Sequence, residues 1–198
     1  MKHFYQNIPG WFSFRGLYEQ AVAAAPTPAR FVEVGCWKGR SAAFLAVEII
    51  NSGKAISLTC VDTWAGSQEK KHQEDPSVIN GTLYREFEDN LAPAVNEFKD
   101  FPDRYFDTRR MPSVHAAMGF AKESVDFVMV DGAHDYESVA TDLNSWWRKI
   151  KAGGVMAGDD FHFDAVGAAV REFFGKIQHE IERVPGTGTG VAWRVRKK

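Results

Sequence analysis

Residues 31–41 read Phe31-Val-Glu-Val-Gly-Cys-Trp-Lys-Gly-Arg-Ser41, and this segment is the strongest indication of the fold. An apolar run carries one acidic residue, ends at a glycine turn and is followed at once by a helical pattern. A second stretch, Asp126-Phe-Val-Met-Val-Asp131-Gly-Ala-His134, is another apolar run that ends on an aspartate. In open α/β sheets, ligands bind where such strands end. We therefore expect an adenosine-bearing ligand at this edge of a sheet, with reacting groups beside it.

The composition is that of one globular domain covering residues 1–198, with 44% hydrophobic and 25% charged residues. A net charge of −2 gives no general attraction to nucleic acid or to an anionic membrane, so we expect neither as a partner. No apolar run approaches the roughly 20 residues of a membrane span. Cys36 and Cys60 fall at the ends of expected strands, which favours buried thiols in a reducing, cytoplasmic environment.

Strand and helix patterns alternate along the chain and finish in a hairpin. Alternation of this kind predicts an α/β fold with a mostly parallel sheet and helices on both faces. The expected helices cover residues 14–25, 39–51, 137–150 and 165–174, and the expected strands cover 30–34, 57–61, 105–109, 124–130 and 155–158. The closing antiparallel hairpin is expected over 178–184 and 191–196, around a glycine-rich turn.

Residues 64–101 form a long insert between two expected strands. The insert is polar over 66–75 and then amphipathic over 83–98, around Pro93. Inserts of this length in compact domains are often lids or binding loops, so a substrate-side lid is one interpretation. A surface excursion followed by an ordinary helix is the other.

The glycine spacing distinguishes between cofactors. A dinucleotide site would carry Gly-x-Gly-x-x-Gly to seat a pyrophosphate, whereas this chain has Gly-x-x-x-Gly after Glu33. The pattern resembles motif I of the class I S-adenosylmethionine-dependent methyltransferases. Their cofactor carries an ammonium and a sulfonium instead of a pyrophosphate, and a nearby carboxylate suits such cations. Asp62 closes the next strand, where an acidic side chain can accept both ribose hydroxyls.

Further stretches, from Ile8 to Phe174, resemble the small-molecule and sugar O-methyltransferases of bacterial biosynthetic clusters. They include Val61-Asp-Thr-Trp-Ala-Gly, Asp131-Gly-Ala-His-Asp-Tyr and Gly153-Gly-Val-Met-Ala-Gly-Asp-Asp-Phe. The resemblance implies the Rossmann-like seven-stranded methyltransferase fold with S-adenosyl-L-methionine as cofactor. It also implies an adenine contact at Ser113 and an adenosine contact at Trp64. The expected cofactor residues are Glu33, Gly35, Trp37, Gly39, Ser41, Asp62, Trp64, Ser113, Asp131 and Gly132.

Three aspartates are expected to converge beside the methyl donor. Asp131 ends one strand, and Asp159 and Asp160 end a strand that neighbours it in a parallel sheet. Carboxylates this close repel unless one is protonated or a cation joins them, and such oxygen ligands suit Mg²⁺ or Ca²⁺. The arrangement is similar to that of catechol O-methyltransferase, which holds a magnesium ion in this way. A metal there would lower the pKa of an acceptor hydroxyl and fix its position.

His134 lies where the catechol enzymes carry a lysine base, and histidine can take a proton near neutral pH. We expect it to be the general base, with Asp131 as a second catalytic residue and His162 as a second candidate for base or ligand. The alternative is that His134 only orients a carboxylate and that aspartates here cap helices, as Asp135 could for the helix that follows it. Asp142 is expected on a helix surface or behind the site, and Trp146 and Trp147 in the core.

The sequence therefore predicts an S-adenosylmethionine-dependent methyltransferase that acts on a hydroxyl of a small molecule or sugar. Two alternatives remain open, a non-catalytic protein that binds the cofactor and an N-methyltransferase without a metal. The aromatic residues among positions 4–14 either shape the acceptor pocket or contact a second subunit in a homo-oligomer.

Overall fold

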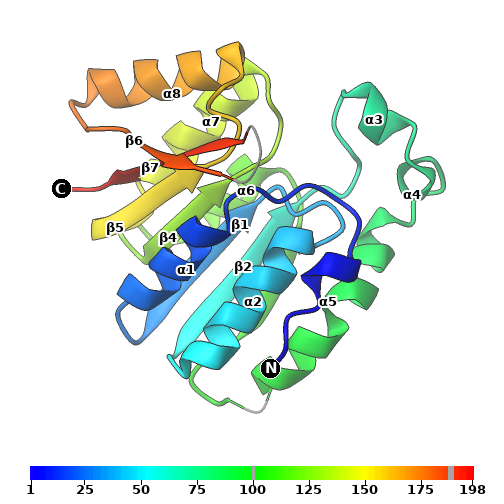
Figure 1. The fold of residues 1–198 in the computed structure, drawn as a ribbon. Coiled ribbons are helices and arrows are strands. Elements are labelled where there is room, and N and C mark those ends of the chain that lie inside the picture. Colours follow the sequence, from blue (N-terminus) through cyan, green and yellow to red (C-terminus); the bar gives the residue numbers. More distant parts are fainter. Residues whose placement is uncertain (100, 187–189) are drawn as a thin grey trace.

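A computed structural model describes residues 1–99, 101–186 and 190–198. Its strands form one seven-stranded sheet in the order β3-β2-β1-β4-β5-β7-β6 (Figure 1). The first five strands are parallel, and β7 runs antiparallel to both β5 and β6. This confirms the predicted fold class, although residues 187–189 of the expected hairpin turn lie outside the described residues. The strands are β1 (Ala29–Val34), β2 (Ile56–Asp62), β3 (Phe106–Arg110), β4 (Val125–Val130), β5 (Ile150–Gly158), β6 (Glu182–Pro185) and β7 (Val191–Arg196).

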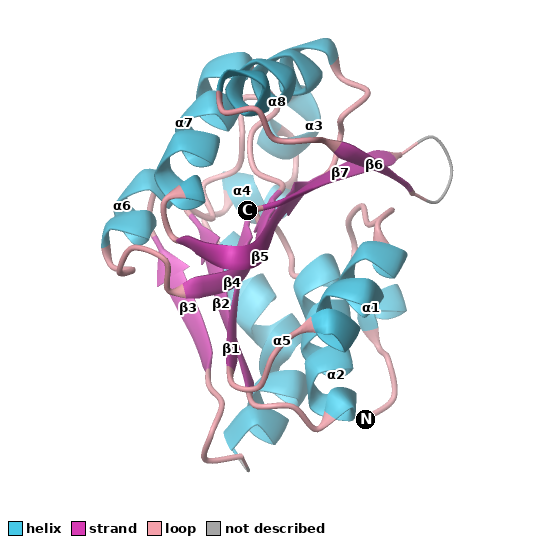
Figure 2. Cartoon of the chain, turned by 90° about the vertical axis from the view of Figure 1, so that its left-hand side faces the viewer, coloured by secondary structure: helices cyan, strands magenta, loops and turns pink. Residues whose placement is uncertain are grey.

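Helices cover both faces of the sheet, as Figure 2 shows. One face carries α1, α2 and α5, and the other carries α6, α7 and α8. The helices are η1 (Tyr5–Asn7), α1 (Arg15–Ala24), α2 (Arg40–Ser52), α3 (Lys70–Gln73), α4 (Pro76–Ile79), α5 (Leu83–Lys99), α6 (Ser113–Met118), α7 (Tyr136–Trp147) and α8 (Asp164–Lys176). No helix within the described part of the chain is long and apolar enough to cross a membrane.

The central strands are buried on both sides, which explains their continuous apolar runs. In β1, Phe31 packs toward the α2 side of the sheet, while Val32 and Val34 pack toward the α7 side. Glu33 is the exception in this strand, because it is fully buried although it is acidic. A buried carboxyl group needs a hydrogen-bond partner, and Ser41 of α2 provides one.

Local signals set the ends of the helices that flank the site. Gly39 precedes α2 with φ of 91°, and Gly53 ends that helix with φ of 66°, both in the left-handed region that glycine tolerates. Asp135 caps α7 by accepting a hydrogen bond from the backbone N–H of Ser138 at 2.9 Å, which confirms the predicted capping role. The helix ends at Trp147, before the predicted Ile150, because Ile150 already pairs with Val125 as the first residue of β5.

The insert over residues 64–101 divides into two parts with different surroundings. Its second part is α5, which packs against α2 and buries Phe87, Leu91 and Phe98 in the core. Its first part carries α3 and α4 and projects from the carboxyl-end edge of the sheet (Figure 1). Only the polar first part is therefore placed to cover a ligand, since α5 is a core helix.

Candidate cofactor and active site

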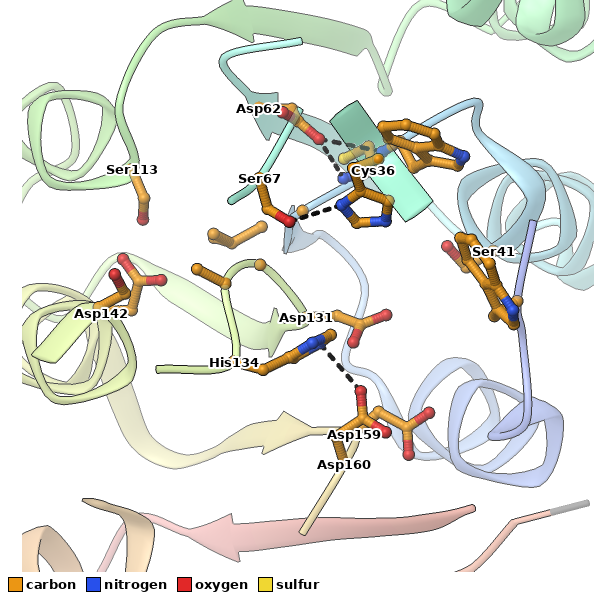
Figure 3. A pocket seen from close by; sticks show the side chains of 18 of the residues that line it. Cys36, Ser41, Asp62, Ser67, Ser113, Asp131, His134, Asp142, Asp159 and Asp160 are labelled. Atoms are coloured by element: carbon orange, nitrogen blue, oxygen red, sulfur yellow. Dashed lines mark hydrogen bonds and ion pairs between the residues drawn. The ribbon is translucent and has the colours of Figure 1, made fainter. Parts of the chain in front are cut away.

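A cleft of about 970 Å³ lies where the parallel strands end. The residues after β1, β2, β4 and β5 form its floor, and the segment 10–13, the insert and the helices α6 and α7 form its walls (Figure 3). Its volume is at the upper end of the range for small-molecule pockets, so it can hold a cofactor together with an acceptor.

The glycine turn after β1 touches the end of β4. A Cβ atom built on Gly35 would lie 2.1 Å from the carbonyl oxygen of Asp131, and the φ of Gly35 is 85°. Any other residue would both collide there and strain the backbone. Gly35 is therefore required for the two strand ends to form one floor.

Asp62 fastens this turn to the end of β2. Its Oδ2 accepts hydrogen bonds from the backbone N–H groups of Cys36 at 2.8 Å and Trp37 at 3.0 Å, and its Oδ1 accepts one from Trp64 at 2.8 Å. A carboxylate offers about four acceptor sites, so Oδ1 retains capacity for a ribose hydroxyl. Asp62 lines the cleft as predicted, and it also holds the loop against which a cofactor would lie.

Gly35, Trp37, Ser41, Asp62, Ser113, Asp131 and Gly132 of the expected cofactor residues line the cleft. Glu33, Gly39 and Trp64 lie behind its wall instead. A Cβ atom on Gly39 would lie 2.1 Å from Leu91 Cδ2. The absence of a side chain at Gly39 therefore allows α5 to pack against the start of α2. The indole N–H of Trp64 donates to the carbonyl oxygen of Trp37 at 2.9 Å, which supports the glycine turn from beneath.

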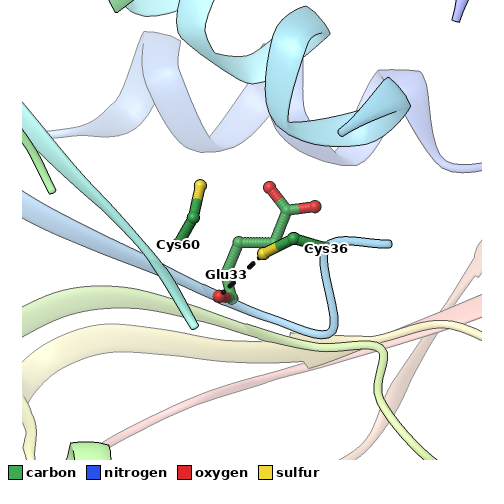
Figure 4. Close-up of side chains that lie close together, drawn as sticks. All are labelled: Glu33, Cys36 and Cys60. Carbon is green, nitrogen blue, oxygen red and sulfur yellow. Dashed lines mark hydrogen bonds between the residues drawn. The ribbon is translucent and has the colours of Figure 1, made fainter. Parts of the chain in front are cut away.

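Glu33 differs most from its expected role as a partner of the cofactor's cationic groups. It accepts a hydrogen bond from the Ser41 hydroxyl and lies beside two buried free thiols, Cys36 and Cys60 (Figure 4). Burial raises the pKa of Glu33 to about 8, a rise that the Ser41 hydrogen bond only partly offsets. Burial also raises the pKa of both thiols, which fits the predicted role of the cysteines as small apolar core residues.

Acidic and histidine side chains gather at the ends of β4 and β5. Asp131, His134 and Asp160 each offer a ligand atom, and these atoms all lie within 4.8 Å of one another. His134 Nε2 lies 2.9 Å from Asp160 Oδ2. Burial and the charges of Asp159 and Asp160 raise the pKa of Asp131 well above its usual range. These carboxylates therefore repel one another, and either a proton on Asp131 or a nearby cation relieves the repulsion.

Asp159, the third predicted metal ligand, lies slightly apart from this group. Its Oδ2 accepts a hydrogen bond from Ser13 at 2.8 Å, while its buried Oδ1 has no partner among the described residues. Burial raises its pKa, and the hydrogen bond from Ser13 partly offsets the rise. The structure thus brings His134 into the cluster more closely than the sequence predicted, and it leaves Asp159 with one open oxygen.

Glu69, in the first part of the insert, is a functional candidate that the sequence did not reveal. Its Oε1 lies 2.7 Å from His134 Nδ1, so both nitrogens of His134 face carboxylates. Burial would lower the pKa of His134, but the pairs with Asp160 and Glu69 outweigh it and hold the pKa above its usual value. His162, the other candidate base, lies at 3.9 Å from Asp160 Oδ1.

A second group of polar residues lies at the opposite end of the cleft. Ser113, at the start of α6, faces Asp142 of α7 (Figure 3). Asp142 was expected outside the site, yet it lines the cleft and is buried. Trp146 and Trp147 are buried as predicted, and the indole N–H of Trp146 donates to Ser113 Oγ at 2.7 Å.

A family model described as a methyltransferase domain matches residues 32–161, which contain the glycine turn, Asp62 and the acidic cluster. The chain belongs to this family. Its resemblance to the class I enzymes is thereby confirmed, the protein is a methyltransferase, and membership implies S-adenosylmethionine as the methyl donor. A search of curated proteins gave no match.

Solved structures share the fold of this methyltransferase at low sequence identity. The O-methyltransferase NovP is similar with a TM-score of 0.69 and 17% identity, over 93% of this chain and 79% of NovP. An S-adenosylmethionine-dependent O-methyltransferase from Thermotoga maritima has a TM-score of 0.57 and 14% identity, over 92% of this chain and 64% of its own. A precorrin-6y C5,15-methyltransferase from Geobacter metallireducens has a TM-score of 0.59 and 14% identity, over 93% and 88%.

Proposed function

We propose that this methyltransferase transfers the methyl group of S-adenosylmethionine to a hydroxyl of a small molecule or sugar. The observation that carries the proposal is the cluster of Asp131, His134 and Asp160 beside the glycine turn, because it places proton acceptors and oxygen ligands next to the methyl donor. The similarity to NovP and to the Thermotoga maritima enzyme, both described as O-methyltransferases, supports oxygen as the acceptor atom.

The cofactor would lie along the cleft floor. Gly35 and Gly132 leave room for the cofactor, and Asp62 would accept a hydrogen bond from its ribose hydroxyls. Trp37 and Ser41 line the cleft beside the glycine turn. Glu33, Gly39 and Trp64 contribute indirectly by fixing the shape of that turn. The sulfonium group supplies a methyl carbon that is open to nucleophilic attack.

We further propose that Mg²⁺ binds at the acidic cluster. Asp131 and Asp160 would provide oxygens at neighbouring strand ends, and Oδ1 of Asp159, which has no partner among the described residues, would provide a third. These hard oxygen donors and their mutual repulsion fit a divalent cation. Such an ion would supply Lewis acidity that lowers the pKa of the acceptor hydroxyl.

His134 is the proposed general base. In the structure both of its nitrogens face carboxylates, so Nε2 must give up its own proton and turn away from Asp160 before it can accept one from the acceptor. The acceptor O–H proton would then pass to Nε2, while the oxygen forms a bond to the methyl carbon and the carbon–sulfur bond breaks. The products are the O-methylated acceptor and S-adenosylhomocysteine.

The acceptor would enter between the N-terminal segment and the insert. Trp11 and Phe163 are exposed at this end, and His72 and Lys71 of the insert line the cleft with them. Aromatic faces beside hydroxyl-binding groups suit a hydroxylated ring or a sugar. We propose that residues 66–73 are the acceptor-side cover, which narrows the predicted lid to the polar part of the insert.

Calorimetric titration of S-adenosylhomocysteine, with Mg²⁺ or with EDTA, tests the cofactor site first. We expect micromolar binding in both conditions. Transfer of labelled methyl from S-adenosylmethionine to a panel of catechols, sugars and amines then tests the reaction. EDTA should abolish transfer to hydroxyls and Mg²⁺ should restore it. Full activity in EDTA would show that the reaction needs no metal. Transfer to amines alone would show that the acceptor atom is nitrogen and not oxygen.

A further inference from the structure

A second, smaller cavity adjoins the cleft beyond the end of β5. Its volume is about 190 Å³, and residues of α8, β6, β7 and the loop before α8 form its walls. The lining residues are Phe161, His162, Phe163, Asp164, Arg171, Arg183 and Val191. This volume is below the usual range for a whole small-molecule ligand, so the cavity is suited to one functional group of a larger ligand.

Two arginines of this cavity approach the same aromatic ring. The guanidinium carbon of Arg171 lies 5.4 Å from the centroid of the Phe161 ring, and that of Arg183 lies 5.0 Å from it. Phe161 is buried, so its ring is a fixed platform for both guanidinium groups. Gly167 leaves the space that Arg171 occupies, because a Cβ atom on this glycine would lie 2.9 Å from Arg171 Nη1. The fold thus gathers two positive charges from α8 and β6 at one point.

The carboxylates nearest to these arginines in the chain are paired with other cations. Glu172 lies 2.6 Å from Lys176 Nζ, and Glu182 lies 2.6 Å from Arg194 Nη2. Asp164 is the carboxylate in the lining of the cavity, and it forms an ion pair with neither arginine. Within the described part of the chain the two arginines therefore remain without an acidic partner, and the lining keeps a net positive charge.

The small cavity and the cleft meet at residues 162 and 163. His162 and Phe163 line both spaces, and both side chains are exposed. His162 Nε2 lies 3.9 Å from Asp160 Oδ1, so this shared rim stands beside the acidic cluster. One molecule that crosses the rim can therefore place a hydroxyl at the cluster and another group between the arginines.

We propose that the acceptor carries a phosphate group and that Arg171 and Arg183 bind it. The inference rests on the proposed function, because it names the class of acceptor for the same site. A guanidinium presents a planar fork of N–H donors that matches phosphate oxygens, and one phosphate has enough oxygens to accept from two forks at once. A carboxylate has two oxygens and would satisfy one fork better than two. The acceptor is accordingly a hydroxylated phosphate ester, such as a sugar phosphate.

Calorimetric titration of inorganic phosphate into the protein saturated with S-adenosylhomocysteine tests the arginine site. The buffer contains EDTA and little salt, so that neither a metal ion nor screening obscures the contact. Phosphate should bind with a dissociation constant on the order of 1 mM or tighter, and acetate should bind at least about tenfold more weakly. Arg171→Gln and Arg183→Gln should each weaken phosphate binding at least about tenfold, because each removes hydrogen bonds between charged groups.

Arg148→Gln is the matched control. Arg148 is an exposed arginine at the C-terminal end of α7, outside the cavity, so its loss removes the same charge from another place. This variant should bind phosphate as the wild type does. All three variants should bind S-adenosylhomocysteine normally, which shows that they are folded. An equal loss of phosphate binding in Arg148→Gln and Arg171→Gln would mean that net charge alone attracts phosphate, and it would overturn the proposal.

Matched pairs of sugars and sugar phosphates, used as acceptors of labelled methyl, test the class of acceptor. The phosphorylated members should have the higher kcat/KM, and Arg183→Gln should remove this preference by raising KM with little change in kcat, because the phosphate is bound away from the reacting atoms. Transfer to the unphosphorylated members alone would overturn the proposal.

The binding experiment also separates this inference from the proposed function. A protein that binds S-adenosylhomocysteine but not phosphate would overturn the arginine site and leave the proposed function in place. Unchanged phosphate binding in both arginine variants, or equal binding of acetate and phosphate, would do the same. If the protein does not bind S-adenosylhomocysteine, the proposed function fails, and the acceptor role of the phosphate site fails with it.

Discussion

The backbones of Gly35 and Asp131 are so close that a Cβ atom on Gly35 would lie 2.1 Å from the Asp131 carbonyl oxygen. The glycine turn after β1, which we propose holds the cofactor, and Asp131 after β4 therefore form one rigid unit. The backbone N–H of Asp131 also donates to the carbonyl oxygen of Val34 at 2.8 Å, which extends the β1–β4 pairing up to the site. A change at the turn must displace the acidic cluster as well.

Gly35→Ala should abolish measurable binding of S-adenosylhomocysteine and lower the free energy of unfolding by about 1–3 kcal/mol. Titration calorimetry and urea denaturation measure the two effects. Gly16→Ala, in α1, is the control, because a Cβ atom there meets nothing within 4 Å. That variant should bind normally and be as stable as the wild type or slightly more so. Normal ligand affinity in Gly35→Ala would contradict the proposed floor of the site.

Glu33 should make the stability of the protein fall as the pH rises. Burial raises its pKa in the folded state to about 8, from an ordinary value of 4.5 in the unfolded chain. Below pH 4.5 both the folded and the unfolded states hold the proton on Glu33, so Glu33 does not reduce the free energy of unfolding. Between those two values only the unfolded state ionises, and the protein loses stability on the order of several kcal/mol, reaching the full loss above pH 8.

Glu33→Gln keeps the shape of the side chain and removes this titration. Urea denaturation at pH 5 and pH 8.5 should therefore show a smaller loss of stability in Glu33→Gln than in the wild type. The exposed Glu19→Gln, in α1, should follow the wild type. The same decline in Glu33→Gln and wild type would show that Glu33 is ionised in the folded protein.

The fold could be predicted because its signals are local. Apolar runs, the glycine turn and the alternation of strands with helices sufficed for the parallel sheet and its closing hairpin. Asp62 could also be placed, since it ends a strand next to the turn. Gly39 was placed in the motif but for an incomplete reason, because the contact that requires glycine comes from Leu91, far along the chain in α5.

Glu69 and Asp142 could not be predicted, because their roles depend on distant contacts. Glu69 stands in a polar stretch that is typical of any solvated loop, and only the tertiary fold brings it to His134, 65 positions away. Asp142 follows helical spacing that would suit a surface position, and it becomes buried only because α6 packs against α7. Patterns within one element carry no information about such pairs.

His134→Ala should lower kcat by about 100-fold or more once an acceptor is known, because a positioned base contributes about that much. The affinity for S-adenosylhomocysteine should change little, since His134 lies on the acceptor side. His162→Ala is the comparison, because His162 lies farther from Asp160. A stronger loss of kcat in His162→Ala than in His134→Ala would assign the base to His162.

The last prediction concerns the coupling between the glycine turn after β1 and residues 66–73. Trp37 belongs to the turn, and its ring stacks on His72 with 4.3 Å between ring centroids. Ser67 Oγ lies 2.6 Å from His72 Nδ1, so the segment is fastened to the same ring. A cofactor that orders Trp37 should therefore stabilise the segment.

Hydrogen exchange measures this coupling directly. S-Adenosylhomocysteine should slow exchange at the amides of His72 and Gln73, whose N–H groups bond to the carbonyl oxygen of Glu69. In Trp37→Ala the ligand should no longer slow them, even at concentrations that saturate the site. The amide of Glu86, in α5, serves as the internal reference and should not respond in either protein. Equal protection of His72 in wild type and Trp37→Ala would show that the segment closes without the stacking contact.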